Sequence, residues 1–317
     1  MRTLLFIFAV AITQDLRSQT QEGTFQQELD RIRESEKRSF AAWKADQQNS
    51  AAYSVASDNI DLHYIQCNWE INPAIRYIKG NITYHFTTTE NASSVVFDLS
   101  KPLIADSVLY HGNKVVTEQN DADGLIIRLP SDLAKGSTDS LTIHYQGVPQ
   151  SNGFGSFYQG AHAGIPVIWT LSEPFGAKEW WPCKNKLADK IDSLDIQISC
   201  PKMYQPSANG LMTANTITGE TRYTSFRHRY PIATYLVALA VTNYQVSDNW
   251  IVVGNDTMLL QNFSYPESAG VFNGFTEFHV NAFKAFTKWF EPYPFRKEKY
   301  GHTQWDWNGG MEHQTNT

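Results

Sequence analysis

The sequence predicts a mainly β protein, in which a large antiparallel sheet assembly is followed by a segment with the pattern of a helix. Short runs of alternating polarity recur between Ser57 and Trp250, separated by Gly, Asn, Asp and Pro. Apolar residues make up 42% of the 317 residues and charged ones 18%, a composition that excludes a disordered chain. Aromatic residues, which are enriched in strands and are counted among the apolar ones, make up 13%.

The N-terminus has the features of a secretory signal. The basic start Met1-Arg2-Thr3 precedes the apolar run Leu4 to Ile12, so we expect a signal peptide at about residues 1–18 and an exported protein, periplasmic or extracellular. This run is too short to span a bilayer, which needs about 20 residues, and no later run approaches that length. We therefore expect no transmembrane segment.

Charge and cysteine content restrict the classes of partner and site. The net charge of −6 provides no basic surface for nucleic acid, so no nucleic-acid partner is expected. Three cysteines allow one disulfide at most, and their spacing resembles no zinc site: Cys67, Cys183 and Cys200.

Residues 19–56 form a predicted leader. Between Thr24 and about Gln48 this segment is highly charged, and its apolar residues recur at helical spacing, which predicts an amphipathic helix. These residues are Phe25, Leu29, Ile32, Phe40 and Trp43.

Residues 57–250 form the predicted β domain. Alternating polarity predicts half-buried strands within Ile78–Phe86, Leu141–Tyr145 and Leu194–Ile198. Turn signals such as Asp123-Gly124 and Asn209-Gly210 separate the runs, as in antiparallel assemblies.

Near Ser264 the apolar spacing changes to steps of three and four, which predicts a helix that ends before Pro292. A strand is expected at about Lys299 to Gln304. Because one helix and one strand cannot enclose a core, we expect residues 251–317 to be the incomplete start of a second domain, cut at Thr317. The helical apolar residues are Val271, Phe275, Phe278, Val280, Phe283, Phe286 and Phe290.

The segment from Trp305 to His313 contains candidate binding residues. The adjacent glycines Gly309 and Gly310 let another backbone approach closely, and the carboxylate of Glu312 can accept a positive group. This combination suits the docking of an extended chain with a free amine, that is, a peptide N-terminus. A surface turn with a solvated carboxylate is the alternative interpretation.

A second candidate segment runs from Trp169 to Lys184. It is rich in residues that strands avoid, so we expect a loop held by aromatic residues. Glu173 stands before a proline where the apolar run Ile165 to Leu171 ends, so its carboxylate could project toward a site. A solvated or paired loop carboxylate is again the alternative.

The two segments together resemble the aminopeptidase N family of zinc metallopeptidases, the gluzincins. The run from Gly309 to His313, Gly-Gly-Met-Glu-His, is similar to the family's Gly-x-Met-Glu-Asn motif. Glu173-Pro174, followed by Trp181-Pro182-Cys183, is similar to the upstream segment from Gln-x-Glu to Phe-Pro-Cys. Their order and separation agree as well, so the sequence resembles the N-terminal portion of such an enzyme, ending just after this motif.

The resemblance implies a large, saddle-like antiparallel β-sandwich followed by the truncated start of an α/β, thermolysin-like catalytic domain. It implies that Glu173 and Glu312 bind the α-ammonium of a peptide substrate. Gly309 and Gly310 would form the strand edge that pairs with the substrate backbone. Met311 would lie near the first side-chain pocket, although a core methionine is an equal alternative.

Two positions depart from the family pattern. Leu171 replaces the usual Gln, which removes a polar group near the amine, and His313 replaces the usual Asn. Both changes concern the surroundings of the carboxylates and leave the substrate preference open.

The resemblance also implies a zinc ion that this sequence does not bind. The family's ligands come from a His-Glu-x-x-His helix and a further Glu, but no two of the nine histidines stand four residues apart. We therefore expect no catalytic residue and no metal ligand here, with the zinc ligands of the intact enzyme beyond Thr317. The fragment alone should be inactive, and its partners would be the remainder of the catalytic domain and peptides with a free N-terminus.

A competing interpretation is a non-catalytic peptide- or carbohydrate-binding β module or scaffold. Trp180-Trp181 and Trp305-x-Trp307 could form an aromatic platform, although paired tryptophans more often pack in a core.

Overall fold

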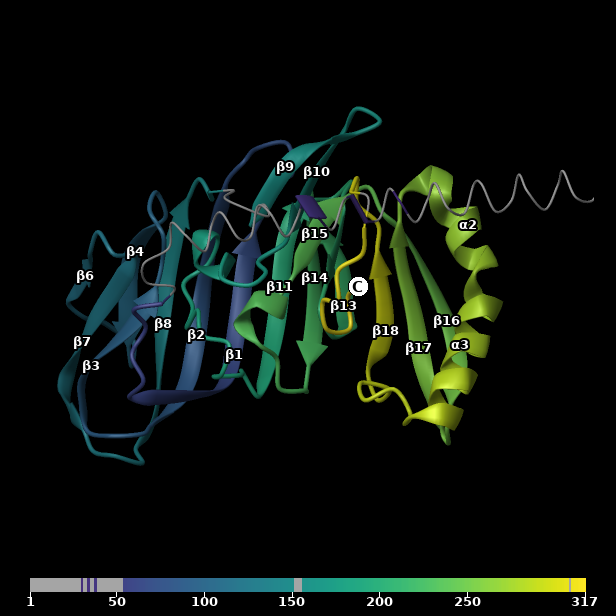
Figure 1. Cartoon of the computed structure of the whole chain (residues 1–317). Helices are drawn as coiled ribbons and strands as arrows, with labels where there is room; N and C mark the ends of the chain where they lie inside the picture. The colour runs from purple at the N-terminus through teal and green to yellow at the C-terminus, as the bar shows by residue number, and fades with distance from the viewer. Residues whose placement is uncertain (1–29, 31–32, 35–36, 39–53, 151–155, 308) are drawn as a thin grey trace, which may run out of the picture.

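The computed structural model describes residues 30, 33–34, 37–38, 54–150, 156–307 and 309–317 (Figure 1). The predicted signal peptide, residues 1–18, lies outside the described residues. Most of the predicted leader helix does so too; its described positions 30, 33–34 and 37–38 are helical.

Strands dominate the described chain. In order they are β1 (Ile60–Glu70), β2 (Ile78–Thr88), β3 (Ala92–Asp98), β4 (Ile104–Tyr110), β5 (Asn113–Lys114), β6 (Thr117–Gln119), β7 (Gly124–Leu133), β8 (Thr138–Gly147), β9 (Phe157–His162), β10 (Ile165–Thr170), β11 (Ser193–Pro201), β12 (Gln205–Ala208), β13 (Leu211–Thr218), β14 (Thr221–His228), β15 (Leu239–Thr242), β16 (Gln245–Val253), β17 (Asp256–Ser264) and β18 (Lys299–Thr303). The helices are the 3-10 turns η1 (Ala177–Glu179), η2 (Thr234–Leu236) and η3 (Pro266–Ser268), and the α-helices α2 (Ala269–Gly274) and α3 (Thr276–Trp289).

The largest sheet has eight strands in the order β13-β14-β11-β1-β2-β8-β4-β5. Its neighbours are antiparallel except β1 and β11, which run parallel with Tyr64 opposite Ser193 and Glu70 opposite Ser199. Parallel neighbours require a long crossover connection. Here that connection contains β2 to β10 and the loop with Glu173, so the crossover brings this loop to the centre of the sheet.

Alternation along the strands directs one face of this sheet into the core. In β1, Trp69 is buried whereas Glu70 is exposed. The sheets β3-β7-β6 and β12-β15-β10-β9 share the main core with it. Tyr84 of β2 meets Phe97 of β3 across the layers, with ring centroids 4.4 Å apart. This arrangement confirms the predicted mainly β, sandwich-like fold.

A second unit follows at the other end of the molecule (Figure 1). Strands β16, β17 and β18 form a three-stranded sheet, and α2 and α3 lie against it. The expected helix and the expected strand near Lys299 are thus confirmed, but they pack on β16 and β17. The predicted start of the second domain, residue 251, falls inside β16. The sequence could not locate this boundary, because a strand shows the same alternation whichever sheet it joins. The small core consists of Ile251, Val253, Met258, Leu260 and Phe283.

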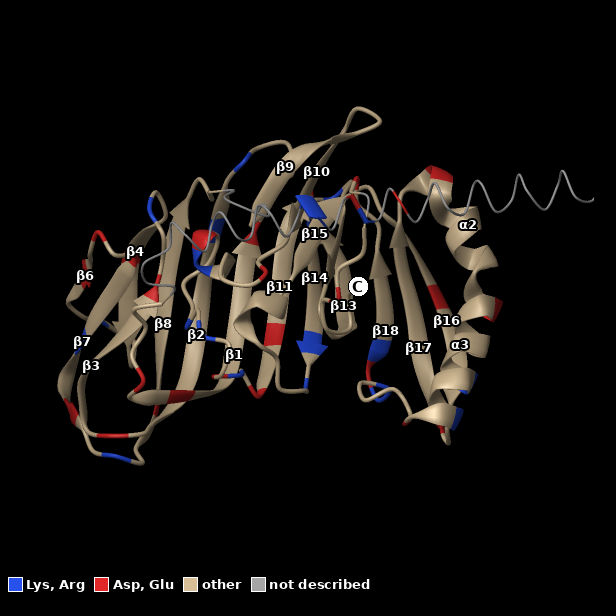
Figure 2. Cartoon of the chain, in the orientation of Figure 1, with Lys and Arg blue, Asp and Glu red and all other residues tan. Residues whose placement is uncertain are grey.

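Three further observations concern the charged residues, the cysteines and membrane-spanning helices. Acidic and basic residues are interspersed along the ribbon (Figure 2). Cys67, Cys183 and Cys200 are all buried and unpaired, so the disulfide that the sequence allowed does not form. Among the described residues, no helix is long and apolar enough to cross a membrane.

Candidate functional site

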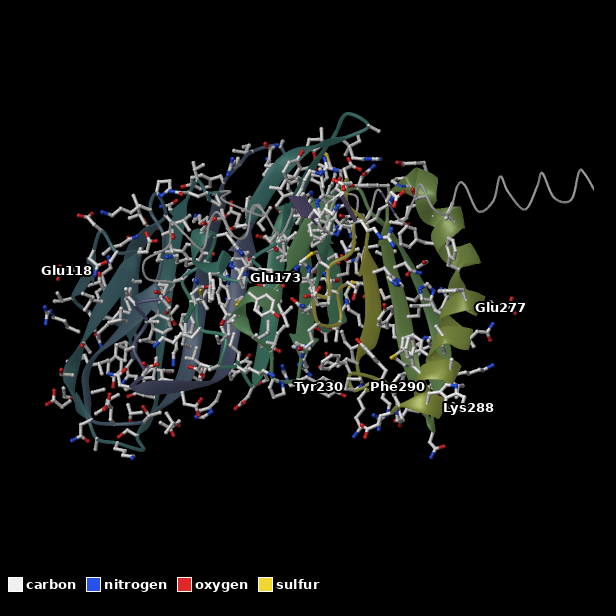
Figure 3. The ribbon with its side chains drawn as sticks, in the orientation of Figure 1. Glu118, Glu173, Tyr230, Glu277, Lys288 and Phe290 are labelled. Atoms are coloured by element: carbon white, nitrogen blue, oxygen red, sulfur yellow. The ribbon has the colours of Figure 1, made fainter. Side chains whose placement is uncertain are left out.

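Glu173 lies in the loop between β10 and β11, near the middle of the molecule (Figure 3). Aromatic residues hold this loop, as predicted. Trp180 Nε1 donates to Ser172 Oγ over 2.8 Å, and the carbonyl of Trp180 accepts a hydrogen bond of 3.0 Å from the Tyr145 hydroxyl. The Trp180 ring is fully buried 5.1 Å from that of Trp69. The start of the loop is therefore anchored in the main core.

Backbone contacts hold the rest of the same loop. Cys183 N donates to Asp98 O (2.9 Å) and Asp98 N donates to Cys183 O (2.8 Å), so the end of the loop pairs with β3. At Gly176 the chain passes so close to Ser156 that an added Cβ would lie 2.2 Å from the Ser156 hydroxyl oxygen. Because glycine has no Cβ, it permits this close approach, which fixes the position of the loop shortly after Glu173.

Glu312 lies on the segment that follows β18 and folds back beside that strand. Thr303 N donates to Thr317 O, and Thr317 N donates to Gly301 O, both over 2.8 Å. Trp305 fixes the start of the segment by packing edge-on against Trp169 of β10, with centroids 4.2 Å apart. The side chain of Glu312 is exposed. The chain is thus held by ring packing before Glu312 and by backbone hydrogen bonds after it.

The other residues of the predicted motif have different environments. Gly309 and Gly310 are exposed and lie outside the described strands, in a bend where Gly309 N donates to Trp307 O (3.2 Å). Their pairing with a substrate backbone stays a prediction. Met311 is buried in the main core with 7% of its surface exposed, which matches the core alternative.

Electrostatics show that the two carboxylates come together. Burial raises the pKa of the half-buried Glu173, and the negative charge of Glu312 raises it further. The pKa of Tyr235, on η2, is also raised, first by burial and then by the charges of Glu173 and Glu312. Among the described residues, neither carboxylate has a hydrogen bond or an ion pair. The fold therefore brings three groups, from distant parts of the sequence, to one site.

Such a site favours a cation. Two neighbouring carboxylates repel each other, and one takes up a proton more readily unless a positive group lies between them. An ammonium group offers three donors, which matches two carboxylates and the oxygen of a phenol. Sequence reasoning missed Tyr235, because nothing in its local sequence links it to either glutamate.

Comparison with known proteins identifies the family of this chain. Residues 61–236 match the family model of the peptidase M1 N-terminal domain. The chain belongs to the M1 peptidase family. The resemblance to the aminopeptidase N family is thereby confirmed. Among curated proteins, none matches the sequence closely enough to count as a relative.

Solved M1 structures share the fold. An M1 zinc metallopeptidase from Deinococcus radiodurans, a substituted form bound to a Tyr-Ser-Ala substrate, has a TM-score of 0.66 at 21% identity. A two-domain M1 zinc metallopeptidase bound to L-tryptophan has a TM-score of 0.66 at 22% identity. Each match covers 78% of this chain and 57% of the other chain. The present chain thus corresponds to little more than half the length of these M1 structures.

The described residues do not fit a zinc ion. No group of three or more His, Cys, Asp or Glu side chains among them is placed to hold a metal. His313, which replaces the motif's Asn, is 3% exposed, and burial lowers its pKa to about 4. Its ring stacks on Trp305 with centroids 5.9 Å apart. His313 is therefore a neutral packing residue at neutral pH.

Two further expectations for this M1 chain can be compared with the structure. Trp180 and Trp181 are 0% and 1% exposed, so the suggestion that they form part of an aromatic platform is wrong. They pack against Trp69 because large aromatic rings contribute most to stability when fully buried. Leu171, at the position of the family's Gln, is also buried, with 1% exposed.

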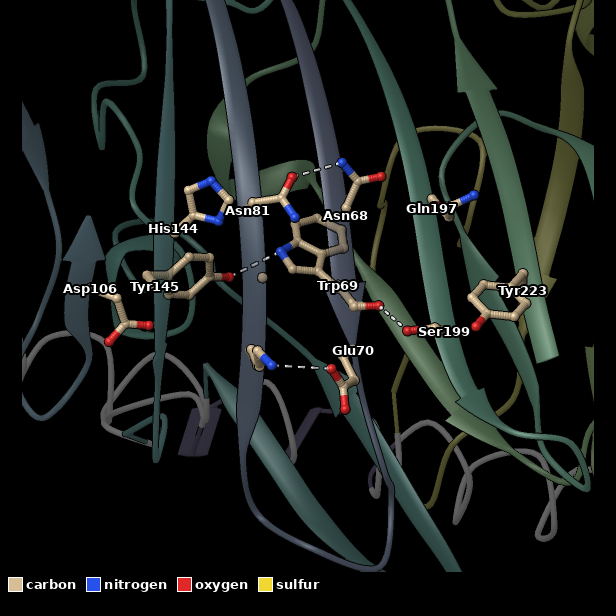
Figure 4. A pocket seen from close by; sticks show the side chains of 12 residues that line it. Asn68, Trp69, Glu70, Asn81, Asp106, His144, Tyr145, Gln197, Ser199 and Tyr223 are labelled. Atoms are coloured by element: carbon tan, nitrogen blue, oxygen red, sulfur yellow. Dashed lines mark hydrogen bonds and ion pairs between the residues drawn. The ribbon is translucent and has the colours of Figure 1, made fainter. Parts of the chain in front are cut away.

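A separate groove of about 210 Å³ lies on the outward face of the eight-stranded sheet (Figure 4). Asn68 of β1 donates to Asn81 of β2 over 3.0 Å at this face, whereas the intervening Trp69 points to the core beside Trp180. Because alternate residues face opposite sides of a sheet, the groove and the Glu173 loop lie on opposite faces. The groove is therefore no part of the carboxylate site.

Proposed function

We propose that this chain is the N-terminal part of an exported, zinc-dependent aminopeptidase, and that its carboxylate site binds the free N-terminus of a peptide substrate. The observation that carries the proposal is the meeting of Glu173 and Glu312: burial and then the charge of Glu312 raise the pKa of Glu173, and neither carboxylate has a partner among the described residues. Membership of the M1 family supports it independently.

The site accounts for selection of a chain end. Glu173 and Glu312 would each accept a charge-assisted hydrogen bond from the α-ammonium, and the hydroxyl of Tyr235, on which both charges act, would accept a third. Each such bond contributes about 1.5–3 kcal/mol, whereas an internal peptide bond offers no positive charge. The site would therefore position the first peptide bond of a substrate and reject internal ones.

The reaction itself requires a zinc ion, which polarises the scissile carbonyl and activates water when bound. Because the described residues do not fit the metal, we place its ligands beyond Thr317 in the intact enzyme and expect the 317-residue chain to be inactive. The coverage of 57% of M1 structures supports a longer intact protein.

The exposed face of the helical unit also supports a partner in the form of the remaining catalytic domain. Along α3 and directly beyond its two ends, aromatic side chains are 53–76% exposed, which is unusual for an aqueous surface. They are Phe275, Phe278, Phe286, Trp289 and Phe290, and Figure 3 shows Phe290 at the end of α3. We propose that the rest of the catalytic domain covers this face.

Export is supported by the basic start and the short apolar run of residues 1–12 alone. Fractionation of the source cells tests it. Recovery of the protein in the cytosol with Met1 retained would reject export.

The central experiment compares a peptide with a free N-terminus and the same peptide N-acetylated, by calorimetric titration of the 317-residue chain at pH 7. We expect the free peptide to bind at least about tenfold tighter than the acetylated one, since acetylation removes the charge. Equal affinities would reject the amine site and favour a binding module without an exopeptidase role.

A further inference from the structure

The imidazole of His162 links three parts of the chain, one of which leads to Glu312. His162 is the last residue of β9, at the tip of the β9–β10 hairpin, which projects beyond the sheets in Figure 1. Its Nδ1 lies 2.8 Å from both carboxylate oxygens of Asp306, in the segment that leads to Glu312. Its Nε2 is hydrogen bonded to Glu267 of η3.

Stacking fixes the plane of the same ring. His162 lies on Tyr265 with centroids 3.6 Å apart and an interplanar angle of 2°. Tyr265 is fully buried, and its backbone N donates to Gln304 Oε1 over 3.0 Å. Because Gln304 precedes Trp305 directly, both the stacking and the bridge act on the start of the segment that carries Glu312.

The bridge has a defined protonation state. A neutral imidazole carries one N–H donor, so with carboxylates at both ring nitrogens one carboxylate would face a lone pair. Only the imidazolium donates to Asp306 and Glu267 together. Burial acts to lower the pKa of His162, but the hydrogen bonds to Glu267 and Asp306 and their charges outweigh it, and the pKa lies above its usual value.

We propose that His162 is a positioning residue for the amine site: as an imidazolium that bridges Asp306 and Glu267, it holds the Glu312 segment against the hairpin that leads into Glu173. The proposal rests on the proposed function for its significance, although its geometry can be tested without any ligand. The two carboxylates reach the site on different segments: Glu173 follows the β9–β10 hairpin and Glu312 follows Asp306. The imidazolium connects the hairpin to the Glu312 segment.

The contact depends on pH with a definite sign. The charged groups that act on the ring are Glu267 from η3 and Asp306 from the Glu312 segment, and the phenol of Tyr265 covers one face. Because the pKa of His162 is raised in the folded state, the bridge is fully formed below about pH 6.5 and is lost as the pH rises through the folded-state pKa. The Glu312 segment should loosen over that interval.

The test measures the segment and the carboxylates in the 317-residue chain by NMR and hydrogen exchange. In His162→Gln, we expect the amides of residues 305–312 to exchange about tenfold faster at pH 6.5, with those of β1 and β2 unchanged. The pKa of Glu173 should fall toward that of a free carboxyl, because Glu312 moves away. In wild type, both ring nitrogens of His162 should carry a proton at pH 6.

Two variants separate positioning from general stability. His162→Arg keeps a planar cation that can bridge both carboxylates, so it should restore slow exchange and remove its dependence on pH between 6 and 8. His111→Gln removes an exposed histidine–carboxylate pair with Asp139 elsewhere on the surface and should change neither measurement.

Two results would overturn the positioning role: an unchanged Glu173 pKa and exchange pattern in His162→Gln, or equal effects in His111→Gln. Failure of the wild-type chain to prefer a free-amine peptide would instead reject the proposed function and leave these measurements valid. The two ideas therefore fail through different observations.

Discussion

At the scale of single residues, the carboxylate site and a buried lysine both place charge where solvent is scarce. Glu173 is half-buried next to Glu312, and this costs free energy until a cation arrives. Lys299 is completely buried, with its ammonium nitrogen 3.0 Å from Ala208 O and 3.1 Å from Gln261 Oε1. Each of these two groups leads to a prediction that depends on pH.

Binding of a free-amine peptide should weaken as the pH falls through the raised pKa of Glu173, because the protonated carboxyl no longer attracts the ammonium. Glu173→Gln and Glu312→Gln should each reduce affinity by about tenfold or more at pH 7. Titration calorimetry between pH 4.5 and 7 measures both effects. Glu118→Gln, at the far end of the molecule in Figure 3, is the matched control and should bind like wild type. A wild-type affinity that does not change over this range would contradict the role of Glu173.

The unfolding free energy should rise with pH above pH 7 on account of Lys299. Burial lowers its pKa to about 7, so between pH 7 and about 10 the unfolded chain binds one proton more than the folded chain. Stability should therefore increase by about 1 kcal/mol per pH unit over the first part of that range. Urea unfolding at pH 7, 8 and 9 measures the slope. Lys299→Met should abolish it, whereas Lys79→Met, at an exposed lysine of β2, should retain it; a slope that survives in Lys299→Met would assign it to other groups.

At the scale of elements, turns and loops set the positions of the strands that carry the site. The turn between β12 and β13 contains Gly210, whose φ is +83° and whose backbone N donates to Thr315 Oγ1 over 2.8 Å. An added Cβ would lie 2.3 Å from the carbonyl oxygen of Arg227 in β14. This glycine thus joins the large sheet to the segment that follows Glu312.

Gly210→Ala should lower the unfolding free energy more than an alanine in an open turn of the same conformation. Gly136 has a φ of +82° with no atom within 4 Å of an added Cβ, so Gly136→Ala should cost about 1 kcal/mol from backbone strain alone. Gly210→Ala should cost at least about 2 kcal/mol more, because backbone atoms of β14 must move. Urea denaturation of both variants decides the point, and equal losses would show that the turn relaxes freely.

At the scale of the whole molecule, the chain forms two hydrophobic cores of different size. The main core joins the eight-stranded sheet to its two covering sheets, and the smaller core lies between α3 and the sheet β16-β17-β18. Phe226 of β14 and Phe263 of β17 connect the two parts with centroids 6.5 Å apart. The opposite face of α3 is apolar and exposed.

Two phenylalanines on α3 should respond differently to truncation. Phe283 lies in the small core and is 9% exposed, so Phe283→Ala should lower the unfolding free energy by about 3 kcal/mol. Phe278 is 66% exposed, so Phe278→Ala should lower the unfolding free energy by less than about 0.5 kcal/mol. Because it removes exposed apolar surface, the same substitution should reduce any self-association of the chain. Thermal unfolding and sedimentation velocity measure the two effects. A large stability loss in Phe278→Ala would mean that this face is already covered.

Much of the fold follows from local pattern, since residues that alternate in polarity form strands in any globular context. The helix before Pro292 and the strand near Lys299 follow from spacing and from the helix-breaking effect of proline. The motif-like runs pointed to Glu173 and Glu312, and the family match confirms the resemblance on which that selection rested.

The tertiary structure alone decided what surrounds these two carboxylates. Tyr235, the bridging His162 and the parallel pairing of β1 with β11 join residues that are far apart in sequence, and no local pattern records such contacts. The assignment of β16 to the second sheet has the same origin. Sequence by itself determined which segments become strands and helices because that choice depends on near neighbours. The site depends on which distant segments share one core, and only the folded chain brings them together.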